Sequence, residues 1–259
     1  MLGRMAAPAD LRRLSRQAAS DIESAMRSDR VRLFQTLPHA CGYFPDRTAQ
    51  NLVIDPAAPH LDQLYGPALE RGFRRAGGHL YFPYCSSCRA CTPCRIDVER
   101  FQPSRSQRRC LKRNADLQVV ESMAGYNSER HALYERYLRQ RHPGGGMDEA
   151  DASDFRRFLT APWSPTLFLE LRQGPRLLGV AVTDLSLHGL SAVYTFFDPD
   201  ETERGLGTFA ILQQVELARR RGIPWIYLGF WIEGHPKMDY KRHFRPLQIR
   251  TIDGWVDMP

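Results

Sequence analysis

Residues 165–252 alternate between strand-like and helix-like segments in an order that limits the folds open to this chain. Three segments rich in apolar, aromatic and β-branched residues are separated by Gln173-Gly174-Pro175 and His188-Gly189, which are typical turns between neighbouring strands. An amphipathic stretch that ends at Gly222 follows, and further apolar segments come after it. The pattern predicts strands at 167–172, 177–187 and 190–197, a helix at 206–221, and strands at 225–230 and 247–252.

Antiparallel strands followed by a helix and another strand resemble the core of the Gcn5-related N-acyltransferases. Gly205, Gly207 and Thr208 stand between the third strand and the helix. Glycines at this point let the backbone approach a ligand, and amides at a helix N-terminus can bind phosphate. The three residues are therefore candidates for a loop that holds the donor substrate. A simple tight turn into the helix is the alternative.

The first half of the chain is organised differently. Residues 1–30 are rich in Ala, Arg and Ser and predict a mobile or loosely helical leader. After them, prolines and glycines separate short segments, including a helix at 61–73 and a strand around Ile96–Val98. We therefore predict an α+β protein. A smaller Cys-containing α+β domain at 31–125 precedes an N-acyltransferase-like mixed sheet with flanking helices at 126–259.

Four cysteines recur at every third position, at Cys85, Cys88, Cys91 and Cys94. Three thiolates at this spacing are typical of iron–sulfur proteins, and a fourth ligand would complete either a cluster or a tetrahedral zinc site. Cys94 is the neighbouring candidate for that fourth ligand, and Cys41 is the distant one. The spacing predicts an iron–sulfur cluster or zinc, with buried, unliganded cysteines as the alternative.

A block of positive charge begins ten residues after Cys94. No acidic residue lies between Phe101 and Ala115, whereas a solvated helix face usually mixes charges of both signs. The whole chain is also basic, with 36 Lys and Arg against 29 Asp and Glu, a formal charge of +7. Both observations favour contact with RNA phosphates. The candidate cations are Arg105, Arg108, Arg109, Lys112 and Arg113.

The composition also bears on the compartment. No apolar run approaches the roughly 20 residues that a membrane-spanning helix needs. The first thirty residues contain four acidic residues and no apolar signal region, which argues against an import leader. Six cysteines without a secretion signal indicate a reducing environment. We therefore expect a cytoplasmic protein with no membrane partner.

Four longer motifs point to one family. Pro103–Arg109, Tyr194–Asp200, Leu206–Ile211 and Lys237–Lys241 together resemble the bacterial leucyl-tRNA–protein transferases, a family similar to the eukaryotic arginyl-tRNA–protein transferases. The motifs are long and stand in the family's order, and the resemblance extends over residues 34–255.

The resemblance implies an enzyme that moves leucine from leucyl-tRNA to the N-terminal amine of proteins that begin with Asp or Glu, which creates an N-degron. It also strengthens the expectation of a metal or iron–sulfur centre, because eukaryotic relatives use N-terminal cysteines in this way. An aminoacyl ester is already activated, so neither ATP nor CoA is expected, and the sequence contains no P-loop. Positioning alone can supply much of the rate.

An acceptor that begins with Asp or Glu brings a carboxylate into the site, and a buried carboxylate needs a cationic partner. The candidates are Arg75, Lys241 and Arg245, with Arg75 and Lys241 ranked first. Alternatively, Arg75 pairs with an acid inside the protein. Lys237, in the same segment as Lys241, is a further candidate for contact with tRNA phosphate.

Tyr194 and Asp198 lie at the end of the third predicted strand, where the N-acyltransferase fold places groups near the reacting amine. They are candidates for orienting or deprotonating it, although Tyr194 could instead belong to the core. A tyrosine could protonate the departing ribose oxygen, and Tyr240 completes the set of catalytic candidates. Backbone amides around residues 227–229 are candidates for stabilising the oxyanion.

Two other classes of function also fit parts of the sequence. An acyl-CoA-dependent N-acetyltransferase would share the core and use Gly205 and Gly207 for pyrophosphate. A noncatalytic RNA-binding metalloprotein would use the cysteines and the basic block. It would leave the acyltransferase-like half without a role.

Overall fold

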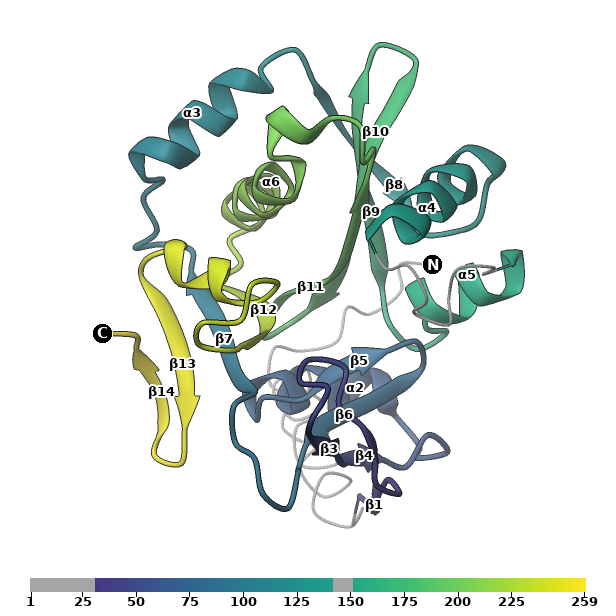
Figure 1. Cartoon of the computed structure of the whole chain (residues 1–259), viewed down its shortest axis with the longest axis vertical. Helices are drawn as coiled ribbons and strands as arrows, with labels where there is room; N and C mark the ends of the chain where they lie inside the picture. Colours follow the sequence, from purple (N-terminus) through teal and green to yellow (C-terminus); the bar gives the residue numbers. More distant parts are fainter. Residues whose placement is uncertain (1–30, 142–150) are drawn as a thin grey trace, which may run out of the picture.

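The structure is a computed structural model, and it describes residues 31–141 and 151–259. The leader expected at residues 1–30 lies outside the described residues. Figure 1 shows one large twisted sheet with helices on both faces and a second, smaller sheet below it. No helix in the described ranges is long and apolar enough to cross a membrane.

The large sheet has eight strands in the order β14-β13-β7-β12-β11-β10-β9-β8. Neighbouring strands are antiparallel except β11 and β12, which are parallel and joined through a helix. The protein is therefore α+β with a mixed sheet. The strands are β7 (Thr92–Asp97), β8 (Gln118–Met123), β9 (Thr166–Gln173), β10 (Arg176–Ser186), β11 (Gly189–Phe197), β12 (Trp225–Trp231), β13 (Leu247–Thr251) and β14 (Gly254–Asp257).

Helices cover both faces of this sheet (Figure 1). On one face, α6 (Leu206–Arg220) packs its apolar side against the sheet, and α3 (Arg105–Arg113) lies outside α6. On the other face, α4 (Ser128–Arg141) and α5 (Ala152–Leu159) bury aromatic and aliphatic side chains against β9–β11. Two short 3₁₀ helices, η1 (Thr202–Arg204) and η2 (Asp239–His243), precede α6 and follow β12.

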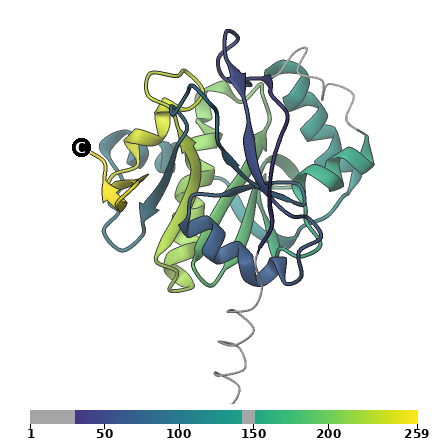
Figure 2. The same ribbon diagram turned by 90° about the horizontal axis from the view of Figure 1, so that it is seen from below.

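The smaller sheet has the strand order β1-β4-β6-β5 and carries one helix. Figure 2 shows this sheet and α2 in front of the large sheet. Tyr65 and Leu69 of α2 share a buried cluster with Tyr227 of β12, which joins the two parts. The elements are β1 (Leu33–Gln35), β4 (Asn51–Ile54), α2 (Leu61–Glu70), β5 (Arg74–Ala76) and β6 (His79–Pro83), with a separate hairpin of β2 (His39–Ala40) and β3 (Thr48–Ala49).

The strands and the helix predicted after residue 165 are confirmed, each within two residues of its expected ends. The division at residue 125 does not match the sheets. β7 lies between β12 and β13 in the large sheet, and β8 forms its far edge, so residues 92–125 belong with the second half. β6 is the last strand of the small sheet in chain order.

β11 and β12 pair over only a short distance. Their ladder contains Leu190 with Ile226 and Ser191 with Tyr227, and no pair follows in either strand. β12 then has a register shift towards β7 at Gly229, whose φ of 85° favours glycine. We call the divergence of the two strands after Ser191 and Tyr227 the strand opening.

Candidate active site

Lys241 lies in η2, which follows β12, and its side chain is buried. Its Nζ donates a hydrogen bond to the carbonyl oxygen of Phe230 at 2.5 Å. Burial lowers the pKa of this ammonium group to about 8, and the nearby positive charge of Arg74 acts in the same direction. A buried, easily deprotonated amine therefore lies beside β12.

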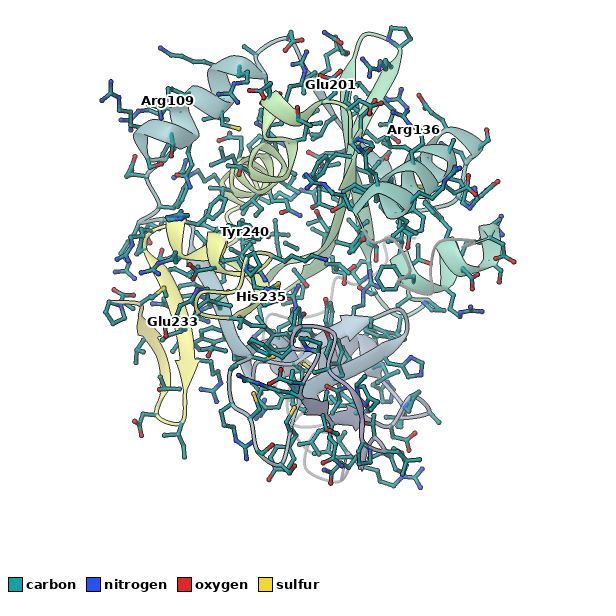
Figure 3. All side chains as sticks on the ribbon, viewed as in Figure 1. Arg109, Arg136, Glu201, Glu233, His235 and Tyr240 are labelled. Atoms are coloured by element: carbon teal, nitrogen blue, oxygen red, sulfur yellow. The ribbon has the colours of Figure 1, made fainter. Side chains whose placement is uncertain are left out.

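Tyr240 precedes Lys241 and remains 42% exposed. The protein around its hydroxyl still raises the pKa of Tyr240 to about 12 by desolvation, with smaller contributions from Cys94 and Tyr137. The phenol is therefore protonated at neutral pH. In Figure 3, Tyr240 and His235 lie in the middle of the molecule, between the part that carries α6 and the small sheet.

Arg74 of β5 reaches across to the strand opening. Its Nη1 donates to the carbonyl of Tyr227 on β12 at 2.8 Å, and its Nη2 donates to the carbonyl of Ala192 on β11 at 2.6 Å. A side chain at Gly229 would meet the Nε of Arg74, because a Cβ placed there lies 3.4 Å from that atom. Arg74 was not among the residues expected from the sequence. The adjacent arginines in a strand were the signal that could have identified it.

Arg75 points elsewhere and already has an acidic partner. Its Nε and Nη2 donate to the two carboxylate oxygens of Asp184 at 2.5 and 2.8 Å. Tyr65 and Thr166 donate to the same carboxylate, each at 2.6 Å. Both ion-paired side chains have no exposed surface. The structural alternative for Arg75 is therefore confirmed, and its fork of donors is not free for an acceptor.

The other predicted acceptor residue, Arg245, lies on the surface. It donates to the carbonyl of Pro259 at 2.9 Å and forms no ion pair with a described residue. Of the three acceptor candidates, Lys241 alone lies near the strand opening. Arg74 lies near Lys241, since the charge of Arg74 helps to lower the pKa of Lys241.

Tyr194 and Asp198 lie on the α4 side of β11. The ring of Tyr194 packs edge-on against Tyr137 and Phe158, and burial raises its pKa far above the ordinary range. Asp198 is buried, and its two oxygens accept from Arg136 at 2.5 Å and Arg176 at 2.7 Å. These contacts hold Asp198 as a structural carboxylate, which argues against its predicted role as a base.

The predicted donor loop and the basic block, about a hundred residues apart in sequence, meet in the structure. Gly205 has a φ of 65° and begins α6, and the Sγ of Cys110 on α3 donates to its carbonyl at 3.5 Å. Asn114, at the end of α3, donates to the carbonyl of Arg204 at 2.8 Å. Gly207 and Thr208 form the first turn of α6 beside this contact.

The cations of α3 face solvent, as Arg109 does in Figure 3. Ser104 begins the helix with a capping box that it forms with Gln107. None of the five cations forms an ion pair with a described residue, so their charge is not neutralised within that part of the protein. The exposed cations are Arg105, Arg108, Arg109, Lys112 and Arg113, and Lys237 is also exposed.

The cysteines divide into two groups. Burial raises the pKa of Cys91 to about 12, and the charges of Cys41, Cys85 and Cys88 raise it further, so these four thiols are neighbours. Cys94 belongs to β7 and lies fully buried in the core beneath α6. Hydrogen bonds from the Ala90 backbone and from Arg47 lower the pKa of Cys88.

The positions of these side chains bear on the expected metal site. Within residues 31–141 and 151–259, no three side chains of the kinds that ligate metals are arranged to hold an ion. The neighbouring thiols therefore do not form a ready site in this conformation.

Comparison with known proteins gives a consistent result. The family model for arginine-tRNA-protein transferase, N terminus, matches residues 39–109, and the model for the C terminus matches residues 129–251. The aspartate/glutamate leucyltransferase of Stenotrophomonas maltophilia strain K279a is 55% identical over 237 residues, which cover 89% of this chain and 94% of the relative.

Two further relatives carry the same name. The aspartate/glutamate leucyltransferase of Xanthomonas campestris pv. campestris strain B100 is 53% identical, over 89% of this chain and 94% of the relative. That of Xylella fastidiosa strain 9a5c is 52% identical, over 88% and 91%. Among solved structures, L-PGS from Bacillus licheniformis gives a TM-score of 0.42 at 10% identity over 58% of this chain and 48% of that chain.

Proposed function

Because the chain belongs to the aspartate/glutamate leucyltransferase family of tRNA–protein transferases, we propose that it transfers leucine from leucyl-tRNA to the N-terminal amine of proteins beginning with Asp or Glu. The observation that carries this proposal is identity of 52–55% over about nine-tenths of the chain with relatives of that name. The product is an N-degron, and the enzyme works in the cytoplasm.

The charge distribution supports an RNA donor. The solvent-facing cations of α3 lie next to the turn that begins α6, so phosphate contacts and the donor loop share one side of the molecule. An N-acyltransferase-like core is supported by the parallel β11–β12 pair that α6 connects and by the strand opening between them. Neither the acetyltransferase alternative nor the noncatalytic RNA-binding alternative agrees with the leucyltransferase names of the relatives.

The reaction needs no further activation. The neutral α-amine attacks the ester carbonyl carbon, a C–N bond forms, and the C–O bond to the ribose breaks. Tyr240 is protonated at neutral pH because its pKa is raised to about 12. Its hydroxyl can therefore donate a proton to the departing ribose oxygen and regain one from the amine. Beyond Tyr227, the edge of β12 that faces β11 carries no ladder pairs and can offer amides to the oxyanion.

The cysteine ligand set remains a prediction. We propose Cys41 as the fourth ligand in place of Cys94, because Cys41 lies near the thiol of Cys91 whereas Cys94 is in the core. Binding would require the loops to close around the ion, since the described side chains are not arranged to hold one. No step of the reaction above depends on a metal.

The proposal is tested with purified protein, leucyl-tRNA or arginyl-tRNA, and peptides that begin with Asp, Glu, Ala or Lys. Mass spectrometry should detect addition of one leucine to the Asp and Glu peptides alone. Equal transfer to Ala and Lys peptides would overturn the acceptor assignment. Preference for arginyl-tRNA would overturn the donor, and turnover with acetyl-CoA instead of tRNA would favour the acetyltransferase alternative.

A further inference from the structure

β5 carries two adjacent arginines whose environments differ completely. Successive residues of a strand point to opposite sides, so Arg74 and Arg75 cannot share one partner. Arg75 meets Asp184, a buried carboxylate. Arg74 faces the strand opening, where its hydrogen bonds to described residues go to backbone carbonyls only.

The contrast holds across the buried arginines of the described residues. Arg75 and Arg130 each bind a carboxylate, that of Asp184 or Glu170. Arg95 forms no ion pair with a described carboxylate, but its Cζ lies 3.6 Å from the ring centroid of Trp225 and 4.4 Å from that of Trp255. Cation–π contact therefore stabilises its charge.

Arg74 has neither kind of partner. It is 7% exposed, forms no ion pair with a described residue and lies over no aromatic ring in that part. A guanidinium has five N–H donors, and described residues accept from two of those of Arg74. Two neutral carbonyls satisfy hydrogen bonds but do not balance a buried charge, which needs an anionic partner.

A second buried cation lies close by. Lys241 likewise has no acidic partner among the described residues, and its Nζ binds the carbonyl of Phe230, next to Gly229 in β12. The charge of Arg74 acts on the side chains of both Lys241 and Tyr240. Ser191, at the start of the strand opening, adds a buried hydroxyl that has no hydrogen-bond partner in the described ranges.

We propose that Arg74 binds the side-chain carboxylate of the acceptor's first residue and that Lys241 supports the same carboxylate, so that this pair selects Asp and Glu. The proposal rests on the leucyl-transfer function. A carboxylate matches the planar fork of Arg74. A tRNA phosphate carries its sugars with it and fits the exposed cations of α3 better than a side chain that is 7% exposed. Holding the side chain at Arg74 places the α-amine of the same residue near Tyr240.

The test compares kcat/KM for peptides that begin with Asp and with Asn, which differ in charge but hardly in shape. Wild type should strongly prefer Asp. Arg74→Met should lower the Asp-to-Asn ratio of kcat/KM on the order of 100-fold, because the acceptor's buried carboxylate loses its cationic partner. Arg74→Lys keeps the charge without the fork and should raise KM for Asp with a smaller change in kcat. Arg95→Met is the matched control, a buried arginine of the same core, and should leave the ratio unchanged.

The outcomes separate the two proposals. Loss of preference in Arg74→Met, with the ratio of Arg95→Met intact, supports the assignment. An unchanged ratio in folded Arg74→Met or Arg74→Lys overturns it. If the ratio is unchanged and tRNA binding is weaker, the anion that Arg74 binds belongs to RNA and the assignment is likewise overturned. If Arg74→Met does not fold, the KM of Arg74→Lys decides. Wild type that transfers leucine to neither peptide contradicts the leucyl-transfer function itself.

Discussion

Arg75 and Asp184 form a two-point ion pair at 2.5 and 2.8 Å in which neither side chain has exposed surface. The pair joins β5 of the small sheet to β10 of the large one, and Tyr65 of α2 donates to the same carboxylate. This contact is one of the places where the two halves of the chain are held together.

We therefore expect Arg75→Met to lower the free energy of unfolding by about 3–5 kcal/mol, because it leaves a buried carboxylate without its cation. Urea unfolding measures the change. Arg100→Met is the control: it breaks ion pairs with Asp97 and Asp257 at the surface, where water screens the charges, and the change there should be much smaller. Equal effects of the two substitutions would contradict the assignment of Arg75 to the core.

The cations of α3 should determine the salt dependence of tRNA binding. Replacing all five with Ala should flatten the slope of log Kd against log salt by about 0.7–0.9 for each phosphate that the variant no longer binds. Arg220 and Arg221 are suitable controls, because both pair with Glu121. Their replacement should leave the slope nearly unchanged. A folded five-fold variant with the wild-type slope would show that α3 is only a solvated surface.

Measurements of metal content should show which cysteines bind a metal. Anaerobically purified protein is expected to contain iron or zinc, and visible absorption distinguishes a cluster from zinc. Cys41→Ser should lose the metal, whereas Cys94→Val should keep it, because Cys94 lies in the apolar core. Absence of both metals from the wild-type sample would assign these thiols a structural role, and loss on Cys94→Val alone would make Cys94 the fourth ligand.

Lys241 should make stability depend on pH in a defined window. Its folded-state pKa of about 8 lies below the ordinary 10.5. Between these values the unfolded chain holds a proton on Lys241 that the folded protein has released, so the contribution of Lys241 to the free energy of unfolding rises with pH there. The thiols of Cys91 and Cys94 act in the opposite direction above pH 9, because burial raises their pKa values from 9.0 to about 12 and about 11. Their contribution is present in both wild type and a Lys241 variant, so a comparison of the two largely removes it.

The measurement is the difference in unfolding free energy between wild type and Lys241→Met. It should shift in favour of wild type by on the order of 3 kcal/mol between pH 8 and 10.5. A difference that does not change with pH would mean that the ammonium is not desolvated.

Tyr240→Phe should lower kcat by roughly 10²-fold and leave tRNA affinity nearly unchanged, because it removes the proton donor and keeps the ring. Single-turnover transfer from leucyl-tRNA measures this step. Tyr194→Phe is the paired control and should have little effect, since the ring of Tyr194 packs among other aromatic rings. The reverse result would make Tyr194 the catalytic residue.

Local patterns in the sequence were sufficient to predict most helices and strands of the second half. Leu206–Arg220 is predictable because its apolar residues recur at helical spacing, and β10 and β11 because a glycine turn separates two apolar runs. Partners distant in sequence were not predictable. Nothing near Ile96 indicates that its strand pairs with residues 225–231 and 247–251.

The choice between Arg74 and Arg75 shows the same limit within a single strand. The sequence predicted Arg75 as a residue that binds the acceptor carboxylate, but the two neighbours differ only in the side to which each points. That side depends on where Asp184 lies, more than a hundred residues away. One residue of register therefore decides which arginine is internal structure and which faces the strand opening.

The central position of β7 also affects how the protein is made. During synthesis, β7 leaves the ribosome long before β12 and β13, the strands that border it on either side. Its apolar residues, among them Cys94 and Ile96, cannot be buried until both neighbouring strands have been made. Contacts so distant in sequence form slowly. Separate expression of residues 31–125 and 126–259 would leave each piece with an unfinished sheet edge, and the two should recover activity only when they are produced together.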